Sequence, residues 1–201
     1  KYGGVIVDND HCDPSTWNNH GSLVEFKSQW YVFYHRSTHN SRMMRKACVE
    51  PIFFNDDGSI DEVEMTSQGA GPPLNAFDKI DAERACLLFG NVRIQLFDNN
   101  NEELAGIQNG DNVAYKYINF ETGVKEVLIR VKPLENGGTI LVRLDQPWRS
   151  PIAKINVSGS EDGDWKTITR EIEKTKGIHA VWLTFYGENG GMFEIDWFEF
   201  N

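Results

Sequence analysis

The chain has 201 residues, a formal net charge of −10, six tryptophans and 12% aromatic residues. This acidic balance argues against a nucleic acid or an anionic membrane as the partner. No apolar run approaches the ~20 residues of a membrane-spanning helix. Cys12, Cys48 and Cys86 are spaced irregularly, so they fit neither a disulfide framework nor a metal motif, and we expect buried free thiols. Residues 1–4 read like the interior of a longer protein, so we expect a fragment boundary there rather than a signal peptide.

The first segment, residues 1–73, has the pattern of a small antiparallel sheet. A strand at 23–26, a turn at 27–29 and a strongly apolar strand at 30–36 predict a hairpin. Further strands are expected at 45–54 and 59–65, on either side of an Asn-Asp-Asp-Gly turn signal. Together these make about four strands, the content of one propeller blade. Asp8, Asp10 and Asp13 precede this region and are interpreted as turn and capping residues.

A short Gly/Pro-dense stretch, residues 68–74, is interpreted as the link to a second segment, residues 77–201. Because the link is short, we expect the two parts to pack together. Turn signals recur every 8–12 residues in the second segment, which predicts an antiparallel β-sandwich without helices. The expected strands are residues 92–97, 113–120, 126–132, 138–144, 152–157, 166–173, 179–186 and 192–200.

Apolar and acidic residues alternate through most of the last strand. Strict alternation would place Trp197 on one face and Asp196 on the other, with Phe198 and Phe200. An unpaired carboxylate among aromatic rings is costly, so Asp196 needs a cation or several hydrogen bonds.

Asp81 and Glu83 are spaced by two, which puts both carboxylates on one face of an extended segment. If the first and last strands of the segment pair, these groups and Asp196 converge, and Ca²⁺ would neutralise them. The alternative is two solvated acidic edges.

Several ordered motifs of this segment resemble the family 6 carbohydrate-binding modules. They are Ile-Asp-Ala-Glu at 80–83, Asn-Gly-Asp at 109–111, Gly-Gly-Thr-Ile at 137–140, Asp-Trp-Lys-Thr at 164–167 and Asp-Trp-Phe at 196–198. The resemblance implies a jelly-roll β-sandwich with a structural calcium near its paired terminal strands, which agrees with the convergence of Asp81, Glu83 and Asp196.

The first segment resembles the last blade of the five-bladed glycoside hydrolase family 43, in enzymes with arabinofuranosidase or β-xylosidase activity. The motifs are Asn-Asn-His-Gly-Ser at 18–22, Trp-Tyr-Val-Phe-Tyr-His at 30–35 and Asn-Asp-Asp-Gly-Ser-Ile at 55–60. The resemblance implies that His20 faces the central channel and helps hold a metal or water cluster. Arg36 lies near where some relatives place a substrate-contacting arginine. The alternatives are an ordinary turn histidine and a strand-end arginine in a surface ion pair.

No catalytic residue is assigned. Inverting glycosidases need two carboxyl groups about 6.5–9.5 Å apart, and the resemblance implies that earlier blades supply them. A single blade would also expose strand edges, so we expect the remaining propeller blades as partners.

The resemblance further implies a sugar-binding cleft at the loop end of the sandwich, built from a Tyr, a Trp and an Asn. The Trp is present as Trp165, whereas the Tyr position falls on Gly106 or Ile107 and the Asn position on Gly191. A second cleft on the concave sheet face would use a Trp where this chain has Asn112.

Trp148, in a loop, is a candidate substitute for the missing aromatic platform. The alternatives are packing of Trp148 against the neighbouring blade and edge burial of Trp165 in the sandwich.

These features predict an all-β chain: about one propeller blade followed by a carbohydrate-binding sandwich. We expect the C-terminal portion of a glycosidase that acts on arabinoxylan- or arabinan-type polysaccharide. In the alternative interpretation, the sandwich is a structural buttress for the propeller with little or no glycan affinity. The resemblance also implies a secreted or periplasmic protein.

Overall fold

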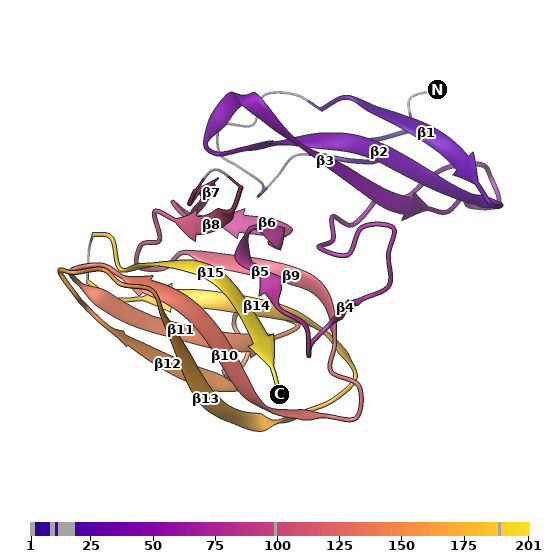
Figure 1. The fold of residues 1–201 in the computed structure, drawn as a ribbon. Helices are drawn as coiled ribbons and strands as arrows, with labels where there is room; N and C mark the ends of the chain where they lie inside the picture. The colour runs from indigo at the N-terminus through magenta and orange to yellow at the C-terminus, as the bar shows by residue number, and fades with distance from the viewer. Residues whose placement is uncertain (1–2, 9–10, 12–18, 99, 189) are drawn as a thin grey trace.

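The computed structural model describes residues 3–8, 11, 19–98, 100–188 and 190–201 of the chain. A three-stranded sheet lies against a larger β-sandwich made of two sheets (Figure 1). In that view the short strands β6, β7 and β8 lie between the three-stranded sheet and the long strands of the sandwich. The prediction of an all-β fold with a sandwich is confirmed.

The three-stranded sheet is antiparallel, in the order β1-β2-β3. Its strands are β1 (Gly21–Phe26), β2 (Gln29–Thr38) and β3 (Ser41–Ile52). The β1–β2 turn has positive φ at both Lys27 and Ser28, which suits a two-residue hairpin. The strand expected at 59–65 does not form: Ile60 makes only an isolated bridge to Phe54, and the Val63 N–H donates to the Ile6 carbonyl instead. The prediction of a fourth strand is therefore wrong for these described residues.

The sandwich consists of two six-stranded sheets. The first has the order β13 (Lys166–Thr175), β10 (Val124–Pro133), β15 (Phe193–Phe200), β8 (Glu102–Ala105) and β7 (Arg93–Leu96), and β5 (Ile80–Asp81) also pairs with β15. The second has the order β12 (Ala153–Ser158), β11 (Gly137–Leu144), β14 (Ile178–Tyr186), β9 (Asn112–Asn119) and β4 (Leu74–Asn75), and β6 (Leu87–Phe89) also pairs with β9. Every pairing is antiparallel except that of β4 with β9, so sandwich pairing already begins at Leu74.

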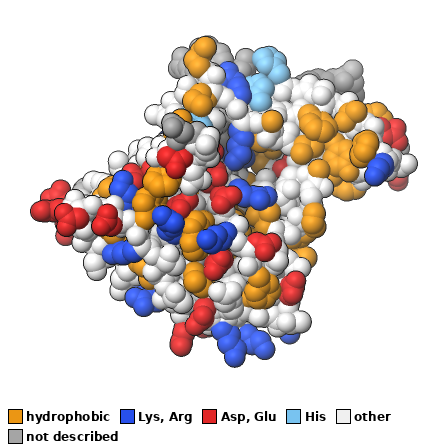
Figure 2. Space-filling view, in the orientation of Figure 1, with side chains coloured by type: hydrophobic (Ala, Val, Ile, Leu, Met, Phe, Trp, Pro, Cys, Tyr) orange, Lys and Arg blue, Asp and Glu red, His pale blue; other side chains and the backbone are white. Residues whose placement is uncertain are grey.

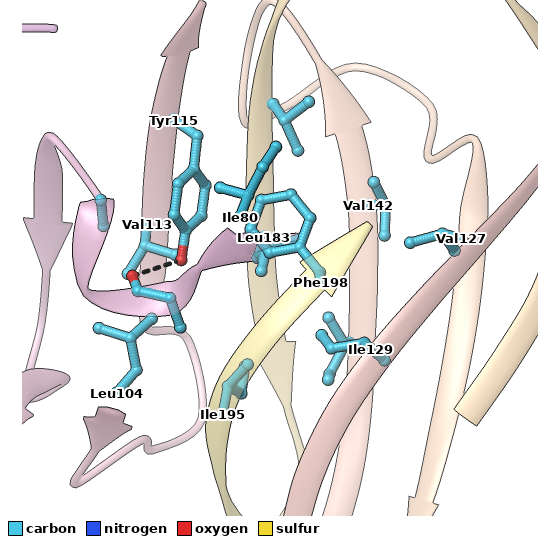
Figure 3. Packing of buried hydrophobic residues seen from close by; sticks show 14 of the residues in the cluster. Ile80, Leu104, Val113, Tyr115, Val127, Ile129, Val142, Leu183, Ile195 and Phe198 are labelled. Atoms are coloured by element: carbon cyan, nitrogen blue, oxygen red, sulfur yellow. Dashed lines mark hydrogen bonds between the residues drawn. The ribbon is translucent and has the colours of Figure 1, made fainter. Parts of the chain in front are cut away.

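The core of the sandwich lies between the two sheets. Tyr115, Leu183, Ile195 and Phe198 are buried there, on strands from both sheets (Figure 3). The Tyr115 hydroxyl donates to the Ala82 carbonyl at 2.8 Å, so its one polar atom is satisfied inside the core. This bond ties the segment before β6 to the central strand β9.

The last strand departs from the strict alternation that its sequence suggested. A β-bulge interrupts its pairing with β10: Trp197 pairs with Arg130 and Ile195 with Val131, which leaves Asp196 as the extra residue. Phe198 and Phe200 therefore join Ile195 in the core, and Asp196 does not share their face. The prediction that Asp196 lies with these two rings is wrong, because one inserted residue reverses the side-chain phase.

The first and last strands of the sandwich do pair, as predicted: Asp81 is opposite Trp197 and Ile80 is opposite Phe198. The extended segment, however, ends at Asp81. Residues Ala82–Arg84 form a 3₁₀ turn, η1. The expectation that Asp81 and Glu83 share a strand face is wrong, because side chains in a 3₁₀ turn do not follow the two-residue period.

Among the described residues there is no helix with the length and apolar character needed to span a bilayer.

Candidate functional site

The three-stranded sheet and the sandwich are joined by a polar seam along β9. Glu64 accepts hydrogen bonds from Lys116 Nζ at 2.7 Å and from the Tyr117 hydroxyl at 2.8 Å. The Lys116 carbonyl accepts from the Ser67 and Gln68 N–H groups at 2.5 and 3.2 Å. Burial, and then the hydrogen bond to Glu64, raise the pKa of Tyr117 to about 12. The link between the two parts is therefore fixed to the sandwich by main-chain and side-chain bonds.

An aromatic stack extends this seam on the outer face of the second sheet. The His11 ring stacks on Phe89 with 4.2 Å between centroids, and Phe89 lies 5.8 Å from Trp182. The Leu88 N–H donates to the His11 carbonyl at 2.5 Å. His11 thus covers part of an aromatic patch of the sandwich. Sequence reasoning missed these residues; adjacent apolar residues in the short β6 strand were the only local signal.

His20 is exposed and lies beside His35 of β2. The His20 N–H donates to His35 Nε2 at 3.2 Å, and His20 Nδ1 lies 3.4 Å from the same nitrogen. Partial burial, followed by the positive charge of Arg45, lowers the pKa of His35. The structure therefore pairs His20 with a second histidine. Its predicted role in a channel stays a prediction.

Arg36 is 6% exposed, so the alternative that placed this strand-end arginine at the surface is wrong. It lines a pocket at the seam together with Lys46 of β3 and Arg84 of η1. Lys46 Nζ donates to the Glu83 carbonyl at 2.7 Å, which joins β3 to the 3₁₀ turn.

The three predicted metal ligands are not brought together as a set. Within the described part of the chain, no three His, Cys, Asp or Glu side chains are grouped closely enough to hold a metal ion. Asp196 accepts from the Asn101 amide at 3.0 Å and from Arg130 Nε at 3.2 Å, so its partners are an amide and a guanidinium. These bonds satisfy a carboxylate that is 6% exposed.

The carboxyl groups of Asp81 and Glu83 differ from that of Asp196 in their surroundings. Burial is the main cause that raises the pKa of Glu83 to about 7, and the negative charges of Asp81 and Glu102 add to the shift. Glu83 Oε2 is buried and has no hydrogen-bond partner. A carboxylate oxygen in this state fits a hard cation, which would supply the missing partner. Asp196 does not fit that role, because its oxygens already bind Asn101 and Arg130.

Trp165, the one platform residue retained from the expected loop-end cleft, is half-buried. Its ring meets Phe97 edge-on with 5.0 Å between centroids, and the Arg130 guanidinium lies 5.5 Å from its centroid. Of the two candidate positions for the missing aromatic, Ile107 is buried and Gly106 has φ +66°. A bulky side chain is disfavoured in this conformation, so the backbone itself is unsuited to a platform there.

Trp148 is 77% exposed, on the loop between β11 and β12. The base of the loop is held by Asp145, whose carboxylate lies 3.0 Å from His179 Nδ1 and 3.1 Å from Arg149 Nη1. The Trp182 indole donates to the Asp145 carbonyl at 3.2 Å. The loop is anchored, so Trp148 is presented to solvent from a fixed base. Of the two predicted sugar-contacting residues, only Trp148 offers an open ring.

The sequence also predicted free cysteines and turn aspartates, and some of these lie among the described residues. Cys86 is buried and Cys48 half-buried, and both are free thiols, as predicted. Cys12, Asp10 and Asp13 lie outside the described residues.

Comparisons with known proteins cover both parts of the chain. The family model "Carbohydrate binding module (family 6)" matches residues 90–201. A "Xylosidase/arabinosidase" of Thermoclostridium stercorarium is 33% identical over 93% of this chain and 46% of the relative.

Of two similar solved structures, one matches nearly the whole chain and the other about two thirds of it. The glycoside hydrolase family 43 arabinoxylan arabinofuranohydrolase from Bacillus subtilis, in complex with cellotetraose, matches 98% of this chain and 43% of its own, with 27% identity and a TM-score of 0.66. A module from Clostridium stercorarium in complex with cellobiose matches 66% of this chain and 98% of its own, with 29% identity and a TM-score of 0.60. The chain thus spans less than half the length of the xylosidase/arabinosidase and the arabinofuranohydrolase.

Proposed function

This chain belongs to the family 6 carbohydrate-binding modules, and from this membership we propose that it is the C-terminal portion of a glycosidase acting on arabinoxylan- or arabinan-type polysaccharide. The similarity to a family 43 arabinoxylan arabinofuranohydrolase runs through the three-stranded sheet as well as the sandwich, and that continuous match carries the proposal. The substrate class is taken from the activities that name these two relatives, a xylosidase/arabinosidase and an arabinoxylan arabinofuranohydrolase. We also propose a secreted or periplasmic location, as the family resemblance implies.

The partners of the three-stranded sheet are the remaining propeller blades. Large apolar side chains are exposed on this sheet and directly after β3: Val24 is 42%, Phe26 61%, Phe33 47% and Phe53 70% exposed. Apolar side chains gather at one end of this sheet in Figure 2. Neighbouring blades would bury such a surface, which is costly to leave in water. In this proposal His20 faces the propeller channel.

Within that protein, the sandwich acts mainly as a buttress for the blade. The bonds of Lys116 and Tyr117 to Glu64 and to the link hold the two parts together. The expected sugar cleft has lost its second aromatic wall at Gly106, and Trp165 is packed against Phe97. Missing partners for sugar hydroxyls weaken binding, because those groups would be desolvated without hydrogen bonds.

Structural Ca²⁺ at Asp81 and Glu83 is part of the proposal. The buried, unpartnered Glu83 oxygen supports it. Ca²⁺ takes about 6–8 oxygen ligands, so backbone carbonyls and water would complete the shell. When bound, the ion would neutralise the two carboxylates beside β15.

The enzymatic part of the proposal is tested by hydrolysis assays. The longer protein should release arabinose or xylose from arabinoxylan and from aryl glycosides. The 201-residue chain alone should release none, because the acid–base pair is supplied elsewhere. Turnover by this chain that is abolished by changing a carboxylate within residues 1–73 would overturn the fragment interpretation. Absence of any glycosidase activity in the longer protein would refute the parent class.

Glycan binding at Trp148 is the second candidate function, favoured by its 77% exposure on an anchored loop. Stacking on one tryptophan contributes about 1 kcal/mol beyond area burial, whereas a Kd of 1 mM already needs about 4 kcal/mol. We therefore expect weak binding or none when xylohexaose or arabino-xylo-oligosaccharides are titrated by calorimetry. Micromolar affinity that is lost in Trp148→Ala would establish this site. Micromolar affinity that survives both Trp148→Ala and Trp165→Ala would place the function on another surface, such as that around Asn112.

A further inference from the structure

Each ring nitrogen of His179 faces an oxygen atom. Nδ1 lies 3.0 Å from Oδ1 and 3.3 Å from Oδ2 of Asp145, the residue that follows β11. Nε2 lies 3.0 Å from the carbonyl oxygen of Lys176, in the turn between β13 and β14. His179 itself is the second residue of β14. The ring therefore joins three segments: the end of β11, the β13–β14 turn and the start of β14.

These contacts need a proton on both ring nitrogens. A backbone carbonyl and an ionised carboxylate can only accept hydrogen bonds. A neutral imidazole carries one N–H, so its other nitrogen would set a lone pair against the lone pair of an oxygen. The imidazolium form donates from both nitrogens, and the two 3.0 Å distances are those of ordinary hydrogen bonds. The arrangement therefore matches a positively charged His179.

The carboxylate of Asp145 has one other cationic partner. Arg149 Nη1 lies 3.1 Å from Oδ2, but the Arg149 side chain is 60% exposed, so solvent screens this ion pair. Arg143, on β11, donates instead to the Arg149 carbonyl and to the Thr184 hydroxyl. The His179 side chain is 28% exposed. A charged His179 is therefore the better shielded of the two cations that hold the base of this loop.

The remaining charged and titratable groups around the ring come from the adjacent turns and from β9. Lys176 contributes its backbone carbonyl, and Glu121, in the turn after β9, binds the β13–β14 turn through its own carbonyl. Burial is the main cause that raises the pKa of Tyr117 to about 12, so this hydroxyl stays neutral while a histidine titrates. Within the described part of the chain, Asp145 is the one carboxylate in ion-pair contact with His179.

We infer that His179 is a proton-dependent latch: its imidazolium form ties the Trp148 loop (residues 145–152) to the β13–β14 turn, and loss of the proton loosens both. A bond that needs the charged ring is complete at low pH and is lost as the pH rises and the ring releases its proton to solvent. A neutral ring keeps one of the two hydrogen bonds and loses its ion pair with Asp145. The inference concerns the order of the loop, and it depends neither on the proposed hydrolase activity nor on glycan binding at Trp148.

Nuclear magnetic resonance of the 201-residue chain tests the latch directly. Spectra are recorded at about pH 5 and about pH 8.5, on either side of the range in which histidine ordinarily titrates. Nitrogen spectra should show two protonated ring nitrogens in His179 at the lower pH and one at the higher. With fluorotryptophan incorporated, the transverse relaxation rate of the Trp148 fluorine should fall at the higher pH, because a looser loop moves faster. A single protonated nitrogen at pH 5, or one Trp148 rate at both pH values, would overturn the inference.

Two variants assign the effect to this contact. In Asp145→Asn, the amide can donate to or accept from the ring by rotating, so the Trp148 relaxation rate should no longer depend on pH. Asp145 has φ +64°, a conformation that asparagine tolerates, so the turn should be kept. Arg149→Gln is the matched control: it removes the other cation and leaves His179 in place, so the pH dependence should persist. A pH dependence that survives in Asp145→Asn, or that disappears in Arg149→Gln, would contradict the latch.

Discussion

The hydrogen bond between Tyr117 and Glu64 allows the coupling between the two parts of the chain to be measured. Tyr117→Phe removes only the hydroxyl that donates to Glu64 at 2.8 Å. A hydrogen bond to a charged group contributes about 1.5–3 kcal/mol when buried. The Glu64 side chain is 49% exposed, so solvent reduces the expected contribution to about 1 kcal/mol. For a chain of this size, that corresponds to a fall in Tm of about 2–4 °C.

A double-mutant cycle separates this bond from other effects of each change. Tyr117→Phe, Glu64→Gln and the double variant are compared by urea unfolding at neutral pH. We expect the double variant to lose less stability than the sum of the two single variants, with a coupling of about 1 kcal/mol. Tyr186→Phe, an exposed tyrosine on β14, is the matched control and should leave stability unchanged. Single-variant effects that add to within about 0.3 kcal/mol would refute the assigned contact.

Three further predictions concern metal, pH and the last strand. Chelation with EDTA should lower the Tm, because an ion bound only to the folded state stabilises it by mass action. An unchanged melting curve would count against the calcium proposal. So would EDTA sensitivity that persists in an Asp81→Asn, Glu83→Gln double variant. In EDTA, the free energy of unfolding should fall as pH rises from about 4.5 to about 7, because the folded state holds the Glu83 proton more tightly than the unfolded state. Urea unfolding over a pH series should show a flatter pH dependence of stability for Glu83→Gln. Identical pH dependence in the two chains would contradict the raised pKa assigned to Glu83. Asp196→Ala should destabilise the chain by about 1–3 kcal/mol with or without Ca²⁺, because it removes the partner of Arg130 and Asn101. A loss of stability seen only with Ca²⁺ present would make Asp196 a metal ligand instead.

The sequence predicted the sandwich well because most of its strands alternate regularly and end at turn residues. The pairing of the first and last strands was implied by the family resemblance of the motifs that contain Asp81 and Trp197. The bulge at Asp196 was not predicted, because the register of β15 is set by its partner strand β10 and not by the local sequence pattern. One local signal was available: the adjacent apolar residues Trp197 and Phe198 mark a change of phase after Asp196.

The seam was the least predictable region. Arg36 reads as an ordinary strand-end cation, and its burial follows only from the sandwich packed against β2. Glu83 leaves the extended segment because the chain turns at Ala82, whose carbonyl binds Tyr115. Such long-range contacts have no periodic signature in the sequence. The metal set was therefore predicted from residue spacing together with the family resemblance, and the channel role of His20 from the resemblance alone.

The central claim is that the sandwich supports the glycosidase part more than it binds glycan. Thermal inactivation of the longer protein, followed as arabinose release from soluble arabinoxylan, tests this most directly. The account predicts a shorter half-life for the Tyr117→Phe, Glu64→Gln variant, and an unchanged half-life and initial rate for Trp148→Ala, Trp165→Ala. A normal half-life for the first variant, together with a large loss of initial rate for the second, would contradict it.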